Sequence, residues 1–384
     1  MNRDLSIKDL SKGDGPLSCV DPQDQIPLPA PFDKIEEEPA IGTLTGKAKE
    51  SYVVVDDTIA VNLPKPKNKE EEEKLVNQFL SGLRKCFNQS DNWTFLQPLL
   101  ISMEHCAKCQ TCNEACPIYE ESGNNPLYRP TFRSEAIRRI YYKYVKNAST
   151  WVHGDIDLNW KVVSRLIELS YRCNLCRRCA QTCPIGADNA LLAREIRKIA
   201  SQEMGIAPRE LHESGSMLQL KVGSSTGMNA LVVKDNLEFI DEDTTDKTDI
   251  EVKTPWDVEG ADILLIHNAG EIMAWPENPG AFAVLFNAAG LSWTLSSDLA
   301  AYDGINYGVW YDDVQFARVA LLHAQAARKL GVKKIVIGEC GHAHKALTVI
   351  ADKVLTGDLN VPRESAMTVL LEIVRSGKIK FDKS

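Results

Sequence analysis

The chain is 384 residues long, 44% hydrophobic, and carries a formal net charge of -9. This length allows a substantial buried core and suggests two or three domains. The acidic balance argues against nucleic acid as a partner. No apolar run approaches the roughly 18 residues needed to cross a bilayer, and the first residues show no apolar signal region. We therefore expect a cytoplasmic protein that stays soluble or is peripheral on the cytoplasmic face of a membrane through partner subunits.

Residues 1–75 differ in composition from the rest of the chain. They contain prolines, acidic runs at Glu36–Glu38 and Glu70–Glu73, and one strand-like stretch, SYVVVDDTIAV. This composition predicts an extended N-terminal arm. The arm either lies over a partner subunit or is a solvated tail, because composition does not separate the two. Cys19 and Cys86 stand outside any motif and are interpreted as ordinary thiols.

A helix is predicted next, within residues 71–100. Its apolar positions recur at helical spacing, namely Leu75, Phe79, Leu83 and Phe87. Such spacing is typical of an amphipathic helix. This helix would lead directly into the first cysteine motif.

Eight of the eleven cysteines stand in two copies of the pattern C-x2-C-x2-C-x3-C-P. The copies are Cys106, Cys109, Cys112 and Cys116 before Pro117, and Cys173, Cys176, Cys179 and Cys183 before Pro184. This is the bacterial ferredoxin pattern, and its repetition predicts two 4Fe-4S clusters. In two-cluster ferredoxins the fourth cysteine serves the other cluster. We therefore assign Cys106, Cys109, Cys112 and Cys183 to cluster 1, and Cys173, Cys176, Cys179 and Cys116 to cluster 2.

Three other interpretations of the cysteines compete with the clusters: structural zinc, a disulfide framework and coincidence. Zinc prefers two separated C-x2-C pairs or mixed Cys/His sets. Disulfides do not persist in a reducing cytosol. No C-x2-C-H occurs, so covalently attached haem is not indicated.

Segment 117–172, between the motifs, is longer than a compact ferredoxin needs, and its pattern is helical at 133–146 and 159–172. On the second helix, one face is shared by Trp160, Val163, Leu166, Ile167 and Ser170. A further helix is predicted over 189–205, capped by Asp188 and ended by Gly205. Basic residues gather in this region: Arg138, Arg139, Lys143, Arg172, Arg177 and Arg178. They either tune cluster potential or form a solvated helix face.

From about Thr254 the chain alternates between apolar runs and helical stretches. Strands are predicted within 261–270, 291–297 and 333–340, and helices within 280–290, 314–331 and 344–355. This alternation implies a parallel sheet covered by helices. The fold class is therefore α+β: an expanded, mostly helical two-cluster ferredoxin domain followed by an α/β domain. Sites in such sheets lie at the carboxyl ends of the strands, which points to loops 267–271 and 338–344.

The second of these loops contains Cys340, His342 and His344. A cysteine that leads into a helix near imidazoles favours the thiolate. Cys340 is thus a candidate cluster ligand, redox thiol or nucleophile, with His342 beside it. The alternative is a tight turn in which Gly341 fits the backbone and the histidines only pack or cap. A G-x-G-x-x-G fingerprint is absent, so a nicotinamide site is not supported.

With the twin motifs, the phrase GECGHAHK and the run HNAGEIMAWPENPGAFAVLFNAAGLSWTLSS, the chain resembles heterodisulfide reductase D-type iron-sulfur subunits. The likeness runs from about Gln78 onward and is closest to the DsrK type of the DsrMKJOP complex, with relatives in the Hme and Tmc complexes. The resemblance implies electrons passing between a cytochrome b-like or quinone-reactive membrane subunit and a disulfide or trisulfide. The substrate would be a small DsrC-like thiol/disulfide protein or a heterodisulfide.

The sequence departs from this family in its second half. Its last residues resemble the midpoint of such proteins, and Cys340 is the only cysteine after Cys183, whereas a full CCG-type unit offers about five. A third cluster is therefore expected only with ligands from elsewhere. In that interpretation, Cys340 and His342 edge a thiol/disulfide site that a second half completes. The alternative is the electron-transfer subunit of a glycolate- or glycerol-3-phosphate-type dehydrogenase feeding quinone.

These interpretations divide the chain into four parts. They are an N-terminal arm (1–75), a helical ferredoxin-type domain (76–215), a linker (216–253) and an α/β CCG-like half-domain (254–384). In either functional interpretation we expect an oxidoreductase subunit.

Overall fold

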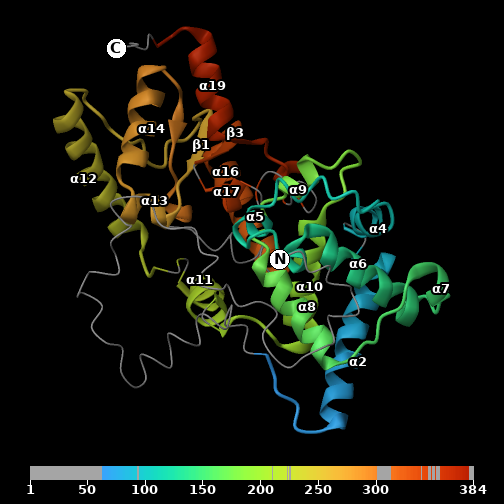
Figure 1. Ribbon diagram of the computed structural model, residues 1–384. Coiled ribbons are helices and arrows are strands. Elements are labelled where there is room, and N and C mark those ends of the chain that lie inside the picture. Colours follow the sequence, from blue (N-terminus) through green and yellow to red (C-terminus); the bar gives the residue numbers. More distant parts are fainter. Residues whose placement is uncertain are drawn as a thin grey trace, which may run out of the picture. The chain divides into compact units, whose positions relative to one another are not determined.

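The computed structural model describes residues 63–92, 95–209, 211–222, 224, 226–300, 313–338, 340–344, 347, 351 and 355–379 (Figure 1). The chain forms two compact units that divide between residues 209 and 210. Most of the predicted arm, with SYVVVDDTIAV and Cys19, lies outside the described residues. No helix in the described part is both long and apolar enough to cross a bilayer.

The first unit is built from helices and short helical turns. They are α2 (Lys69–Cys86), α3 (Gln89–Asn92), α4 (Leu96–Glu104), α5 (Pro117–Glu121), η4 (Pro126–Tyr128), α6 (Pro130–Ile140), the π-helical η5 (Tyr141–Val145), α7 (Thr150–His153), α8 (Trp160–Arg172), α9 (Arg178–Gln181) and α10 (Asn189–Met204).

Helix α10 is the centre of this unit, because α2, α4, α6 and α8 all pack against it. The contact with α2 is close: a Cβ added at Gly82 would lie 2.7 Å from Ile199 Cγ2. The predicted face of α8 is buried, with Val163, Leu166 and Ile167 fully covered. Burial of these aliphatic side chains stabilises the unit by about 1.5–3 kcal/mol for each.

The predicted ends of α10 are confirmed. The Asp188 side chain accepts hydrogen bonds from the backbone N-H groups of Ala190 and Leu191, and Gly205 ends the helix in the left-handed conformation. The helix predicted within 71–100 is interrupted, however. Helix α2 ends at Cys86, and the Asn88 side chain and carbonyl accept bonds from Ser90 and Asn92, which begins a new turn.

The second unit contains a four-stranded parallel sheet in the order β2-β1-β3-β4. The strands are β1 (Ile263–Ile266), β2 (Trp293–Thr294), β3 (Lys334–Ile337) and β4 (Arg363–Ser365). The helical elements are the π-helical η6 (Leu211–Met217), α11 (Leu218–Val222), α12 (Ala230–Thr248), α13 (Ala269–Ala274), α14 (Glu277–Ala288), η7 (Ser297–Leu299), α16 (Asp313–Leu330), α17 (Gly341–His344), η9 (Gly357–Leu359) and α19 (Ala366–Ser376).

Successive residues of β1 point to opposite faces of this sheet. Ile263 and Leu265 join a core with helices α12, α14 and α19. Leu264 and Ile266 join a second core with α16. The sheet is thus covered on both faces, which confirms the predicted α/β architecture.

Two features of this unit differ from the sequence interpretation. Segment 216–253, predicted as a linker, contains α11 and α12, and α12 buries Val233, Leu237 and Ile240 in the core with the sheet. The edge strand β4 was not predicted, because a three-residue strand carries too little alternation to be recognised. Much of the helix predicted at 344–355 lies outside the described residues.

Candidate iron-sulfur site

The two cysteine motifs have matching environments, position by position. The second cysteine of each motif, Cys109 or Cys176, is exposed, and the third, Cys112 or Cys179, is buried. The first and fourth cysteines of both motifs are half-buried. The two loops therefore present their thiols in the same way, as expected for two equivalent sites.

The backbone of the two loops also matches. Lys108 and Gln110 have φ of 56° and 72°, and the corresponding residues of the second loop, Leu175 and Arg177, have φ of 55° and 61°. For residues other than glycine this conformation costs about 1–2 kcal/mol each. Alternating right- and left-handed residues turn successive N-H groups toward one side, which forms the anion-binding concavity found at many Fe-S sites. Strain of this kind concentrates at functional sites.

The fourth cysteine of the second motif acts electrostatically on cysteines of the first motif. Burial raises the pKa of Cys106, and the nearby Cys183 and Cys109 thiols raise it further. Burial raises the pKa of Cys112 to about 11, with Cys106, Cys109 and Cys183 all contributing. Cys183 therefore lies within electrostatic reach of Cys106 and Cys112, as the set assigned to cluster 1 requires.

The reciprocal relationship holds for the second motif. Burial raises the pKa of Cys116, and Cys173 of the other motif adds to this effect. Burial, Asp188 and Cys173 raise the pKa of Cys179 to about 12. Cys116 therefore lies within electrostatic reach of Cys173, as cluster 2 requires.

No group of three Cys, His, Asp or Glu side chains in the described part of the chain is close enough to hold a single metal ion. A cubane spreads its thiolates over several iron atoms, so its cysteines lie farther apart than the ligands of one zinc ion. The donor set contains only thiols, and left-handed residues flank the second cysteine of each motif. The eight cysteines thus fit 4Fe-4S clusters.

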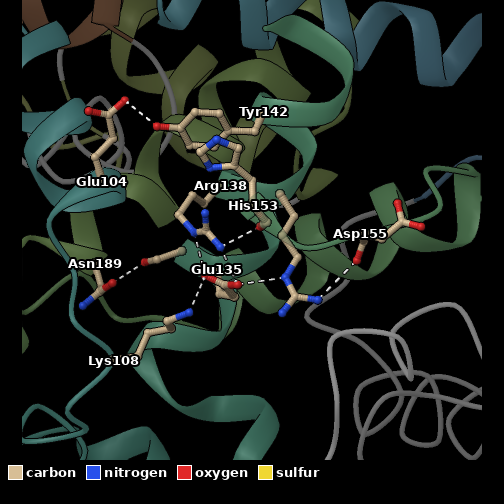
Figure 2. A network of polar contacts seen from close by, with 10 residues as sticks. Glu104, Lys108, Glu135, Arg138, Tyr142, His153, Asp155 and Asn189 are labelled. Atoms are coloured by element: carbon tan, nitrogen blue, oxygen red, sulfur yellow. Dashed lines mark hydrogen bonds and ion pairs between the residues drawn. The ribbon is translucent and has the colours of Figure 1, made fainter. Parts of the chain in front are cut away.

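Glu135 on α6 anchors the first loop through a network of ion pairs (Figure 2). Its carboxylate lies 3.3 Å from Lys108 Nζ in the loop and 2.8 Å from the Nε atoms of both Arg138 and Arg139. Burial favours the neutral acid, but hydrogen bonds from the two arginines outweigh it and lower the pKa of Glu135 to about 2. The carboxylate is therefore ionised at neutral pH and holds three cations.

Two of these cations also hold the chain beyond α6. Arg138 Nη2 donates to the His153 carbonyl at 2.8 Å, and Arg139 Nη1 donates to the Asp155 carbonyl at 3.2 Å. The predicted basic residues Arg138 and Arg139 are thus paired structural groups. Lys143 pairs with Asp155 in the same region, at 2.8 Å.

The second loop is held differently. Arg177 Nε donates to Asp188 at 2.6 Å, which ties the loop to the cap of α10. The fully buried Arg197 donates to the backbone carbonyls of Ser170 and Cys173, and its guanidinium lies 4.6 Å from the Tyr171 ring centre. Burial lowers the pKa of Arg197 to about 10, so this group stays charged at neutral pH.

Sequence reasoning missed two buried arginines at this loop, Arg197 and Arg133. Arg133 is 2% exposed on α6, and its positive charge acts on both Cys116 and Cys179. No pattern in the sequence distinguishes the buried Arg133 from Arg138 and Arg139, which are half-buried on the same helix, because burial depends on helix packing.

In the second unit, the strand order reverses between β1 and β3, which places a topological switch point at their carboxyl ends. The two predicted loops meet there. His267 Nδ1 lies 2.9 Å from Glu271 Oε1, and Glu271 also accepts from Asn278 at 2.8 Å and from the Asn268 backbone at 2.7 Å. A Cβ on Gly338 would lie 2.7 Å from Glu271 Oε1 and 3.3 Å from His267 Nδ1.

Gly338 is therefore the glycine of this loop that has no room for a side chain. A Cβ at Gly341, in contrast, would meet nothing within 4 Å. Asn268 and Glu271 form a capping box at the start of α13, so the first loop is a rigid, buried turn. A cavity of about 20 Å³ beside His267 has room for about one water molecule.

Cys340 lies two residues after Gly338 and is half-buried. Its backbone carbonyl accepts a hydrogen bond from the His344 backbone N-H at 2.9 Å. Burial lowers the pKa of His344. His342 lies in α17, and its side chain is outside the described part of the chain. Cys340 thus follows by two residues the glycine that approaches the buried His267–Glu271 pair.

Comparison with known proteins agrees with the cysteine geometry. Residues 102–187 match the family described as 4Fe-4S dicluster domain. An Archaeoglobus fulgidus protein, "Hdr-like menaquinol oxidoreductase iron-sulfur subunit 2", is 29% identical over 259 residues. An Archaeoglobus profundus protein, "Hdr-like menaquinol oxidoreductase iron-sulfur subunit", is 27% identical over 253 residues. Both matches cover 63% of this chain and 44% of the relative, and no solved structure matches.

The chain therefore spans less than half the length of these curated relatives. The predicted resemblance to Hdr-like iron-sulfur subunits is confirmed, together with the predicted fold class. The matches support an electron-transfer iron-sulfur subunit with 4Fe-4S chemistry.

Proposed function

We propose that the chain carries two 4Fe-4S clusters with crossed ligation and relays electrons within a heterodisulfide-reductase-like, membrane-associated complex. Cys106, Cys109, Cys112 and Cys183 would hold cluster 1, and Cys173, Cys176, Cys179 and Cys116 would hold cluster 2. The observation that supports this proposal is the electrostatic influence of Cys183 on Cys106 and Cys112, and of Cys173 on Cys116. Such clusters supply one-electron transfer when bound.

The protein's own residues prepare this site. The left-handed residues at matched positions turn backbone N-H groups toward the bound anion. Glu135 fixes Lys108 of the first loop, and Arg197 fixes the backbone at Cys173 of the second. A site held this rigidly reorganises little when its charge changes, which favours fast electron transfer.

The donor and acceptor are proposed from the relatives' names and from the sequence resemblance. A quinone-reactive or cytochrome b-like membrane subunit would exchange electrons at one end. At the other end, a disulfide or trisulfide would react at a DsrK-like site. We place Cys340 at the edge of this reaction site, with His342 next to it. The other residues of the site would come from a partner chain. A third cluster would likewise need ligands from elsewhere, because this chain has one cysteine after Cys183.

Metal analysis of anaerobically purified protein tests the cofactor assignment. Two cubanes correspond to about eight iron atoms per chain. An iron content near four, or stoichiometric zinc, would contradict the assignment. Copurification of the native complex then tests the partners: a flavin dehydrogenase in place of a cytochrome b-like subunit would overturn the Hdr-like assembly while leaving the clusters in place.

A further inference from the structure

Arg133 is a buried cation without a matching anion in the described protein. Its residue exposure is 2%, and its Nε has no hydrogen-bond partner among the described residues. No carboxylate in the described part of the chain forms an ion pair with it. Arginine does not lose its proton in proteins, so burial cannot neutralise this group. An unpaired buried charge is costly, which points to an anionic ligand that completes the site.

The surroundings of Arg133 identify that ligand. The Arg133 charge lies within electrostatic reach of Cys116 and Cys179, two of the residues assigned to cluster 2. The Asp188 carboxylate acts on Cys179 in the opposite direction, but it is paired with Arg177 at 2.6 Å. Arg133 also lies near Arg197. Burial is the main cause of the lowered pKa of Arg197, and the charge of Arg133 lowers it further. Two buried guanidinium groups thus lie within electrostatic reach of one cysteine set. A cubane with four thiolate ligands is a negatively charged group of the required kind.

Among the described residues, the first motif has no buried, unpaired arginine of this kind. Its cations Lys108, Arg138 and Arg139 all pair with Glu135, and their side chains are 17–48% exposed. Pairing and solvent both weaken their field at the cysteines. The two motifs therefore match in ligands and backbone but differ in the charge that surrounds them.

We propose that Arg133 is a positioning residue that supplies the counter-charge of cluster 2 and raises its reduction potential. This inference rests on the proposed two-cluster function. The reduced state carries one more negative charge than the oxidised state, so a buried cation stabilises it more. Arg133 would thereby make cluster 2 easier to reduce than it would be without this charge.

A redox titration of the full chain, followed by electron paramagnetic resonance, tests this proposal. The Cys176→Ala variant, which removes a ligand from the second motif alone, assigns the signal of cluster 2. In Arg133→Met, the midpoint of this signal should fall by at least about 59 mV, a tenfold change in the ratio of reduced to oxidised form for one electron. The signal of cluster 1 should keep its midpoint.

Two further variants separate charge from structure. Arg133→Lys, which keeps the charge, should return the midpoint toward that of the unmodified protein. Arg138→Met, on the same helix but paired with Glu135, should leave the midpoint of cluster 2 in place. The proposal would be overturned if neither midpoint shifts in Arg133→Met, or if both midpoints shift by the same amount.

Iron content shows whether the Arg133→Met variant disturbs cluster assembly. If Arg133→Met loses the iron of cluster 2 and Arg133→Lys restores it, the counter-charge role is supported; if both variants lose iron equally, the role is steric and the proposal fails. An unmodified protein with iron near four would refute the two-cluster function itself, independently of Arg133.

Discussion

Lys108 Nζ lies 3.3 Å from Glu135 Oε2, so an ion pair joins the first cysteine loop to α6. Arg133, two residues before Glu135 on the same helix, acts electrostatically on Cys116 and Cys179. One helix thus presents a paired cation to the first motif and a buried cation without a carboxylate partner to the second. The segment between the motifs is therefore more than a spacer, because it sets the charge around each site.

Replacing Glu135 by Gln should weaken the first unit and reduce its sensitivity to acid. The folded-state pKa of about 2 lies below the ordinary value of 4.5. The ionised carboxylate therefore stabilises the fold fully above pH 4.5, and this stabilisation is lost as the pH falls toward 2. Its size is at most roughly 3 kcal/mol. Thermal unfolding should be measured at neutral pH and near pH 3. Compared with the unmodified protein, Glu135→Gln should have a lower Tm at neutral pH and should lose less Tm on acidification.

Glu121→Gln is the matched control for this prediction, since Glu121 is exposed at the end of α5. Its Tm should follow that of the unmodified protein at both pH values. An equal acid-induced loss of Tm in Glu135→Gln and the unmodified protein would show that the Glu135 network contributes nothing to acid stability.

Crossed ligation predicts that each fourth cysteine serves the cluster of the other motif. Cys116→Ser should damage the cluster held by Cys173, Cys176 and Cys179, and Cys183→Ser should damage the other one. Electron paramagnetic resonance and iron content distinguish these outcomes. Cys86→Ser is the control, because Cys86 is a buried thiol near Glu195 and outside both motifs. Loss of each mutated motif's own cluster would refute the crossed arrangement.

Gly338→Ala should destabilise the edge where β1 and β3 end. The added Cβ would lie 2.7 Å from Glu271 Oε1 and 2.9 Å from the Ile266 carbonyl, so buried groups must shift. Overpacking of this kind costs about 1–3 kcal/mol. Gly341→Ala is the control, because its Cβ would meet nothing within 4 Å. Urea unfolding should show a clear loss for the first variant and little change for the second; equal effects would contradict the close contact.

Cys340→Ala tests the sheet edge as a reaction site. Iron content and both cluster signals should be unchanged, because Cys340 belongs to neither cysteine set. In the assembled complex, turnover linked to a disulfide substrate should be abolished. Full turnover would show that Cys340 is structural, and loss of iron would connect it to a cluster.

Much of the first unit follows from local sequence signals. Asp188 and Gly205 mark the ends of α10 because a side-chain acceptor and a left-handed glycine act on adjacent backbone groups. The length of α2 was not predictable in the same way, since its apolar spacing continues past the point where Asn88 begins a new turn. Segment 216–253 lacks strong hydrophobic periodicity, so its sequence did not predict helix α12. The structure shows this helix because its apolar residues pack in the core.

The sequence alone determined the cofactor chemistry, because cysteine spacing is a local property and the ferredoxin pattern specifies both ligand type and number. It also determined the alternation of strands and helices that forms a parallel sheet. Only the tertiary structure decided which charges surround the cysteines and which glycine is constrained at the sheet edge. Burial of Arg133 and the contact of Gly338 with Glu271 depend on elements distant in the chain. Those contacts leave no trace in local composition or periodicity.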